Sequence, residues 1–408
     1  MFLSHALVSG IRRVGLVLAL MLVLVPSTFG QSASRQLGPL SKRLSRVCVE
    51  KLCTITTMTD DQREQAMVLY EGYSSAHKQL LQDADDTSKV LLEDYRDGGP
   101  DKDWQEFAKK QRDILTKLFD AVRKARADFL TDVQTLLTRE QQARWDLCER
   151  YMRREDTTRI GFMAGSMVDL VAIAEQTRVP REGDAANVLD QYEVAFDSVA
   201  KEWLVKLDGF FKEIKAADPT KEPDEKKMFG MLKEVLELSL KIRNVNRSYA
   251  KQLKDVLADE HKAAFEKAYL AKAYPLVYDK RYVAKLFDRA SALDVLSAQQ
   301  VTELASLRES YERDVALVNA EWAKNIDERQ EHLATDPQQF ERSWDDGDAI
   351  QASRKARKEL DSKIAERVRS LLDESLFADA TKDLKRDEDI RNQDVLPDFD
   401  ELEKSEDE

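Results

Sequence analysis

Glycine, proline and histidine are all scarce in this sequence. Its 408 residues include 13 Gly, 9 Pro and 4 His, whereas 35% of the residues are charged. Leucine, alanine, lysine and glutamate are abundant, and over long stretches these residues favour helix. The scarcity of helix breakers therefore predicts an all-α fold, and the length is sufficient for a buried core.

The shortage of histidine and of several motifs argues against enzyme chemistry. Beyond the first thirty residues, histidine occurs at His77, His261 and His332, in different parts of the chain. No H-E-x-x-H zinc motif, Glu-x-x-His pair, G-x-S-x-G elbow, Gly-rich phosphate loop or Cys-His nucleophile arrangement is present. We therefore expect no catalytic residue and no cofactor. A metal site using His261 and Glu260 is less favoured than a surface histidine.

Cysteine is also rare, and three cysteines are too few for a disulfide framework. If Cys48 and Cys53 share a helix, their spacing points them to different faces, so they should not bond each other. Two interpretations stay open. Either one of them forms a disulfide with Cys148 in an oxidising compartment, or all three are small buried apolar side chains.

The longest apolar run lies near the N-terminus. Arg12 and Arg13 precede an apolar stretch over residues 14–25, and Thr28-Phe29-Gly30 offers small residues for cleavage. This pattern predicts a secretory signal peptide over residues 1–30. An uncleaved anchor is the alternative, although the run is short for a membrane span of about 20 residues. We expect a periplasmic or secreted protein with no membrane span after cleavage.

The chain is acidic, with a formal net charge of −13. Removing Arg12 and Arg13 with the signal peptide gives −13 − 2 = −15. This charge argues against nucleic acid and anionic membranes as partners. A protein partner or an unfolded client remains compatible with it, and the oligomeric state stays open.

A segment of about 119 residues occurs three times. Tyr192 and Tyr311 are 311 − 192 = 119 residues apart, and their neighbours match too, including Trp203 and Trp322. The same step backwards reaches Tyr73. In each copy an apolar stripe with steps of three and four residues follows a breaker-rich loop, which is typical of a helical hairpin. We expect these tyrosines and tryptophans in the core; an exposed aromatic row is the alternative.

We therefore predict three tandem long helical hairpins, joined by short linking helices and stacked into an elongated array. The predicted segments are a signal peptide (1–30), an N-terminal segment (31–57), a hairpin (58–159), a linking helix (160–187, helical over about 160–176), a hairpin (188–274), a linking helix (275–295), a hairpin (296–381) and an acidic disordered tail (382–408).

A short polar pattern recurs at predicted helix starts. Its residues are Thr59 and Gln62 in the first place, Leu137, Thr138 and Gln141 in the second, and Leu296, Ser297 and Gln300 in the third. A hydroxyl residue followed three positions later by Gln fits the capping box, in which each side chain accepts a hydrogen bond from the other residue's backbone N–H. The alternative is that the Gln and the preceding apolar residue line a client-binding surface.

This pattern resembles the periplasmic LTxxQ-motif family (Spy/CpxP-like). Leu137-Thr138-Arg139-Glu140-Gln141 matches the motif literally, whereas the third copy has Ser297 for Thr and the first has Met58 for Leu. Family members are small helical dimers that act as chaperones or envelope-stress regulators, and some relatives bind metal. This chain is longer, and its second hairpin has Thr177-Arg178-Val179-Pro180-Arg181 and Leu257-Ala258-Asp259-Glu260-His261 in place of the motif.

Two functions follow as expectations. The first is a non-catalytic secreted or periplasmic helical binding protein, chaperone-like or scaffolding, which predicts an exposed apolar patch. The alternative is a metal- or stress-sensing envelope protein, which predicts carboxylates and His261 converging on one point.

Overall fold

The computed structural model describes residues 43–97, 104–216, 224–279, 281–335, 347–382 and 384. These residues form α-helices joined by short turns, and no strand occurs among them, which confirms the all-α fold. None of the helices in these ranges has an apolar stretch long enough to cross a membrane. The predicted signal peptide and nearly all of the predicted acidic tail lie outside the described residues.

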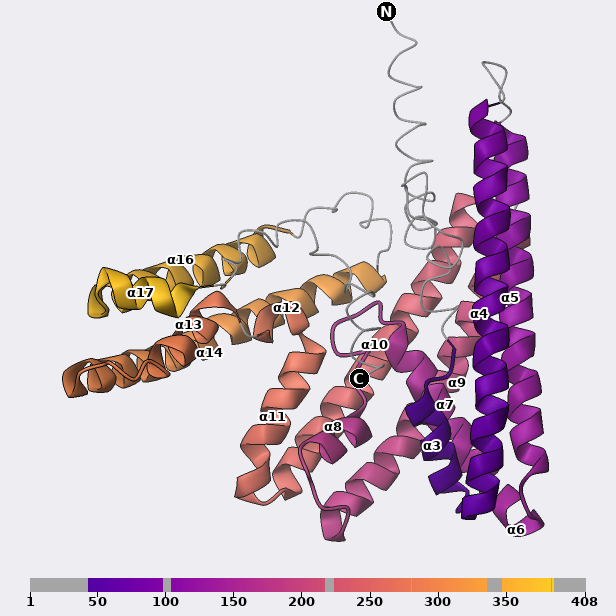
Figure 1. Ribbon diagram of the computed structural model, residues 1–408, viewed down its shortest axis with the longest axis horizontal. Coiled ribbons are helices and arrows are strands. Elements are labelled where there is room, and N and C mark those ends of the chain that lie inside the picture. The colour runs from indigo at the N-terminus through magenta and orange to yellow at the C-terminus, as the bar shows by residue number, and fades with distance from the viewer. Residues whose placement is uncertain are drawn as a thin grey trace, which may run out of the picture. The chain divides into compact units, whose positions relative to one another are not determined.

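The helices follow one order three times: short, long, long, short (Figure 1). Repeat 1 contains α3 (Arg46–Ile55), α4 (Asp60–Asp97), α5 (Trp104–Thr135), the one-turn α6 (Arg139–Gln142) and α7 (Trp145–Arg159). Repeat 2 contains α8 (Leu170–Gln176), α9 (Gly183–Ala216), α10 (Glu225–Val256) and α11 (Asp259–Ala273). After α12 (Pro275–Tyr278), repeat 3 contains α13 (Tyr282–Ser291), α14 (Ala298–Thr335), α16 (Gly347–Leu371) and α17 (Glu374–Thr381).

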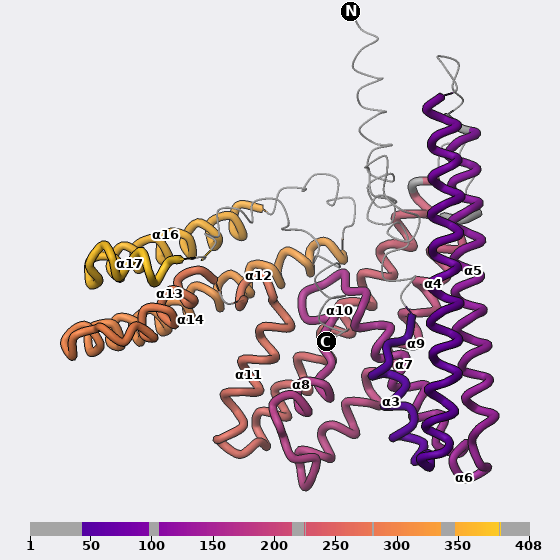
Figure 2. The backbone as a smooth tube through the Cα atoms, viewed as in Figure 1, coloured from indigo at the N-terminus to yellow at the C-terminus, as the bar shows by residue number. Residues whose placement is uncertain are grey.

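The long helices of a repeat pair with each other. The helix α4 packs along α5, and α14 packs along α16 (Figure 2). In repeat 2 the Tyr192 hydroxyl donates to Asn246 Oδ1 over 3.0 Å and links α9 to α10. The short helices pair too, with α3 on α7, α8 on α11 and α13 on α17. The stacking of the three hairpins into an elongated array stays a prediction.

The contacts between helices divide the described residues into two compact units. The first holds residues 43–160 and 197–235, and the second holds residues 161–196 and 236–384. The border falls within α9 and within α10, so it does not follow the borders of the sequence repeats.

The repeated aromatic residues lie in the core, as predicted. Tyr73, Tyr192, Tyr311, Trp203 and Trp322 are all buried. A buried phenol needs hydrogen-bond partners. The Leu44 N–H donates to the Tyr73 hydroxyl over 3.2 Å, and the Leu170 N–H donates to the Tyr192 hydroxyl over 3.3 Å. In repeats 1 and 2, equivalent tyrosines therefore bond to the backbone at the start of the first short helix.

The third tyrosine meets a buried ionic network instead. The Tyr311 hydroxyl donates to Asp361 Oδ1 over 2.8 Å and accepts from Arg357 Nη2 over 3.1 Å. Arg357 also donates to Asn319 Oδ1 over 2.7 Å. Burial and the Asp361 carboxylate raise the pKa of Tyr311, although Arg357 opposes the shift, so the phenol stays a donor.

The predicted helix over residues 160–176 is helical only from Leu170, so the prediction for residues 160–169 was wrong. Gly165 has φ = +77°, a left-handed conformation that glycine adopts without strain. Its N–H donates to the Ala273 carbonyl over 2.9 Å, and its own carbonyl accepts from Asn246 Nδ2 over 2.8 Å. These contacts with α10 and α11 satisfy backbone groups that a helix would have paired internally.

The structure has all three cysteines as free, buried thiols. Cys48 and Cys53 lie on α3 and Cys148 on α7, and all three are at most 1% exposed. Burial and the nearby Glu155 raise the pKa of Cys48 to about 12, and burial and the other two cysteines raise that of Cys148 to about 12. The structure therefore matches the buried-thiol interpretation.

Candidate functional site

The recurring polar pattern forms caps at the end of hairpin 1. Thr59 Oγ1 accepts from the Gln62 N–H over 3.3 Å, and Gln62 Oε1 accepts from the Thr59 N–H over 2.9 Å. Thr138 and Gln141 form the same pair of bonds at 3.3 Å and 2.9 Å. Each pattern thus satisfies two backbone donors at a helix start.

These two caps also hold each other. The amides of Gln62 and Gln141 each donate to the other's Oε1 over 2.9 Å. Gln62 Nε2 donates further to the Leu136 carbonyl over 2.6 Å, and Gln141 Nε2 donates to the Thr57 carbonyl over 3.0 Å. The adjacent Leu137 is buried. The glutamines therefore tie the start of α4 to the turn between α5 and α6.

The third copy repeats half of this arrangement. Ser297 Oγ accepts from the Gln300 N–H over 3.2 Å, and Gln300 Oε1 accepts from the Ser297 N–H over 3.0 Å. Gln300 Nε2 donates to the Leu371 carbonyl over 3.0 Å, as Gln62 does to Leu136. Leu296 is half-buried beside the core of repeat 3. The polar groups of the pattern are thus used within the fold as helix caps, and the preceding apolar residues Leu137 and Leu296 pack on the cores of their repeats.

Repeats 1 and 3 differ in the residues that lie beside these caps. Thr59 and Ser297 are 297 − 59 = 238 residues apart, as are Gln62 and Gln300. By the same step, Val295 and Val301 occupy the places of Thr57 and Arg63. Val295 is 71% exposed and Val301 is 52% exposed. Repeat 3 therefore presents valine to solvent where repeat 1 carries polar residues.

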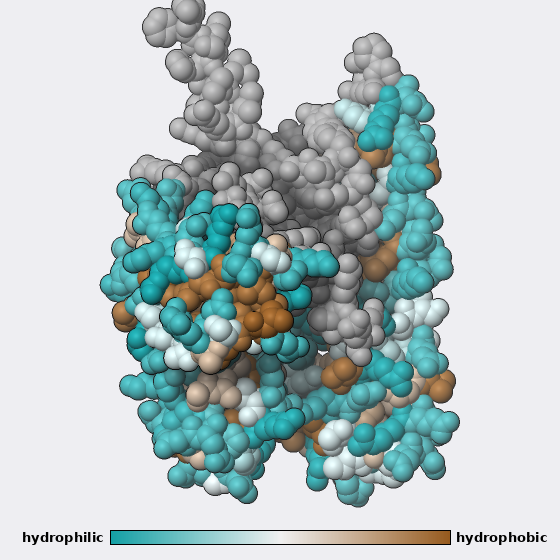
Figure 3. Space-filling view, turned by 60° about the vertical axis from the view of Figure 1, so that its left-hand side comes forward, coloured by the Kyte–Doolittle hydropathy of each residue, from teal (hydrophilic) through white to brown (hydrophobic). Residues whose placement is uncertain are grey.

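The exposed valines border further apolar surface. Half-buried residues pack on the core of repeat 3 at the ends of its helices, and they include Leu293, Leu296, Leu371, Leu376 and Phe377. We call Val295, Val301 and these five residues the apolar end of repeat 3. Figure 3 shows hydrophobic surface gathered on the part formed by α13, α14, α16 and α17, which comes forward in that view. Contiguous apolar surface of this kind marks interaction sites on soluble proteins.

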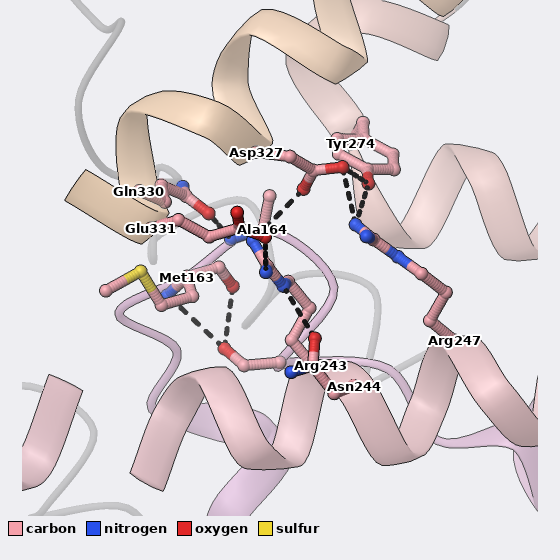
Figure 4. Close-up of polar contacts among 10 residues, drawn as sticks. Met163, Ala164, Arg243, Asn244, Arg247, Tyr274, Asp327, Gln330 and Glu331 are labelled. Carbon is pink, nitrogen blue, oxygen red and sulfur yellow. Dashed lines mark hydrogen bonds and ion pairs between the residues drawn. The ribbon is translucent and has the colours of Figure 1, made fainter. Parts of the chain in front are cut away.

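A polar cluster lies in the second unit, where α10 meets α14 (Figure 4). The buried Arg243 donates to Asp327 Oδ1 over 3.3 Å and to Glu331 Oε1 over 2.6 Å. Arg247 and the Tyr274 hydroxyl both donate to Asp327 Oδ2, over 2.5 Å and 2.9 Å. Burial and the neighbouring Asp327 raise the pKa of Tyr274, so its hydroxyl remains protonated and donates. The cluster fixes the register of α10 against α14.

The sequence repeat indicates only one residue of this cluster, Asp327. The repeat step relates Asp208 to Asp327, since 327 − 208 = 119. The sequence alone, however, did not identify Arg243, Arg247 and Tyr274 as the partners of Asp327. The signal was available, since Arg123 and Arg243 occupy matching places on α5 and α10 at the offset of 120 residues. A pairing between repeats, however, requires knowledge of which helices meet.

The histidines do not converge. His261 Nε2 lies 3.6 Å from Glu260 Oε1, whereas His77 is buried on α4 and packs edge-on against Tyr73. In the part of the chain that the structure describes, no group of three or more His, Cys, Asp or Glu side chains is placed to hold a metal ion.

No protein-family model, no curated protein and no solved structure matches this chain.

Proposed function

We propose that this protein is a non-catalytic extracytoplasmic binding protein that holds a protein client, in a chaperone-like or scaffolding role. The observation that carries the proposal is the apolar end of repeat 3, where Val295 and Val301 are exposed in places that are polar in repeat 1. The resemblance to the LTxxQ-motif family and the predicted signal peptide support the same function and compartment.

The chemistry of this end suits an apolar segment of another protein. Burial of a Val, Leu or Phe side chain contributes roughly 1.5–3 kcal/mol. Three residues of this end, Leu293, Val295 and Leu296, lie in the short turn between α13 and α14, and Val301 lies on α14. A surface on such a short turn and on helices is already ordered, so less conformational entropy is lost on binding. The net negative charge of the chain favours clients that carry basic residues beside their apolar segments.

A matched pair of variants tests this proposal. Val295→Thr with Val301→Arg gives repeat 3 the residues of repeat 1. Leu317→Arg alters another exposed apolar residue, which lies on α14 as Val301 does and is 74% exposed. Each mature chain is added to a chemically unfolded client on dilution, and aggregation is followed by light scattering. We expect suppression by the parent and by Leu317→Arg, and at least a severalfold weaker effect of the double variant.

Two results would contradict the proposal. If the parent does not suppress aggregation even in large excess, the chaperone-like role fails. If the double variant suppresses as well as the parent while circular dichroism shows an unchanged fold, the apolar end of repeat 3 is not the binding surface.

A further inference from the structure

Two ion pairs join successive repeats at the same register. Arg123 on α5 donates to Asp208 on α9 over 2.5 Å, and Arg243 on α10 donates to Asp327 on α14 over 3.3 Å. The arginines are 243 − 123 = 120 residues apart and the aspartates 327 − 208 = 119, which are the offsets of the repeat. The second long helix of one repeat thus pairs with the first long helix of the next in one repeated way.

Repeat 2 offers repeat 1 a second acidic residue. Asp197 on α9, only 7% exposed, accepts from Arg153 on α7 over 2.7 Å. Burial opposes ionisation, but the hydrogen bonds and positive charges of Arg153 and Lys201 together outweigh it, and the pKa of Asp197 is lowered. The side of α9 that meets repeat 1 therefore carries two paired carboxylates.

Repeat 1 has lysine at both of these places. The step of 119 residues leads from Asp197 to Lys78 and from Asp208 to Lys89, and both lysines are exposed on α4. At the other end of the series, the place of Arg123 and Arg243 is taken by Lys358 on α16, since 123 + 235 = 358. Lys358 is exposed as well.

A second change accompanies Lys358. Buried Leu236 on α10 corresponds to exposed Gln351 on α16, because 236 + 115 = 351. Two places of α16 that match buried residues of α10, those of Gln351 and Lys358, are therefore polar and exposed. Terminal members of repeat proteins characteristically have polar outer faces that stop the stacking.

We propose that Lys78 and Lys89 at one end, and Lys358 at the other, are charge caps that prevent a second copy of this chain from adding end to end. A copy added in the register of the internal ion pairs would place Lys358 against Lys89. Like charges then repel where the internal joints attract. The proposal does not depend on the proposed client binding.

Charge reversal tests the caps directly. In Lys78→Asp with Lys89→Asp, the aspartates restore the charge pattern of α9, so Lys358 of another copy becomes an attractive partner. Sedimentation velocity over a concentration series should show larger species than the parent forms, and these should dissociate at high salt because exposed ion pairs are screened. Adding Lys358→Asp to the double variant should return it to the parent's behaviour.

The control reverses two other lysines of the same hairpin. Lys109→Asp with Lys117→Asp, both exposed on α5, makes the same change in net charge and should sediment like the parent. If the Lys78/Lys89 variant sediments like the parent at every concentration, or if the added Lys358→Asp does not reverse its association, the caps do not exist. Equal association of the control would also overturn the proposal.

Discussion

Asp327 is the residue on which most side chains of the α10–α14 cluster depend. Its carboxylate accepts from Arg243, Arg247 and Tyr274, and its own side chain is 16% exposed. Arg243 is 2% exposed, so little water can replace a lost partner. A buried cation left with incomplete pairing is costly, which makes this carboxylate the sensitive point of the cluster.

We expect Asp327→Asn to lower the free energy of unfolding by about 3 kcal/mol, the cost typical of breaking a buried ion pair. Glu331→Gln is the matched control, because Glu331 pairs with the same Arg243 but is 56% exposed. Its cost should stay below about 1 kcal/mol. Urea denaturation followed by circular dichroism measures both free energies of unfolding. Equal losses in the two variants would contradict the expectation that Asp327 contributes more than Glu331.

The buried thiols should be unreactive in the folded protein. With the pKa values of Cys48 and Cys148 raised to about 12, thiolate is scarce at pH 8 and reagents lack access. Ellman's reagent should label the native chain slowly and three thiols per chain in denaturant. Because the folded state keeps its thiol protons above pH 9 while the unfolded chain loses them, stability should also fall as the pH rises from 9 to 12. Rapid native labelling would show that these thiols are accessible.

At the scale of the helices, the reciprocal bond of Gln62 and Gln141 joins α4 to α6. Each single change to Ala should cost about 1 kcal/mol, because a capping bond and a tertiary bond are lost together. The double variant should cost less than the sum of the two, since both single variants break the shared bond. Thermal and urea unfolding measure the cycle. The control is Gln82→Ala, which removes an exposed hydrogen bond to Asp86 on α4 and should change the free energy of unfolding by less than about 0.5 kcal/mol. If the effects of the Gln62 and Gln141 variants add strictly, the two residues are not coupled.

The helices themselves could be predicted from the sequence because their apolar stripes and their Gly and Pro breaks are local signals. The segment over residues 160–169 could not, since it contains Met163, Met167 and Val168 and has the apolar content of a helix. What holds it irregular is distant in sequence: Gly165 bonds to Ala273 and Asn246. The glutamine pair was hidden for the same reason. Its two capping boxes are local patterns, but their mutual bond spans 79 residues.

At the scale of the whole molecule, the three repeats share their core positions but differ at positions near the ends of the series. Matching positions carry Tyr73, Tyr192 and Tyr311, and all three side chains are buried in the core. The exceptions lie at the ends of the series: valine replaces polar residues beside the third cap, and lysine replaces the aspartates of the internal joints. The periodicity visible in the sequence predicted the shared core. The functional proposals instead arise from positions where the periodicity breaks, and these acquire meaning only when the contacts of their counterparts are known.

The segment between repeats 1 and 2, residues 160–169, affects the order in which parts of the chain can fold during synthesis. The Gly165 carbonyl accepts a hydrogen bond from Asn246, which is synthesised 81 residues later. The Ala164 N–H donates to Gln330, which is synthesised 166 residues later. Hairpins close through local contacts and form quickly, whereas contacts across such separations form late. During synthesis from the N-terminus, repeat 1 can therefore fold while this segment remains unbound, and the segment takes its final place only once α14 has been made.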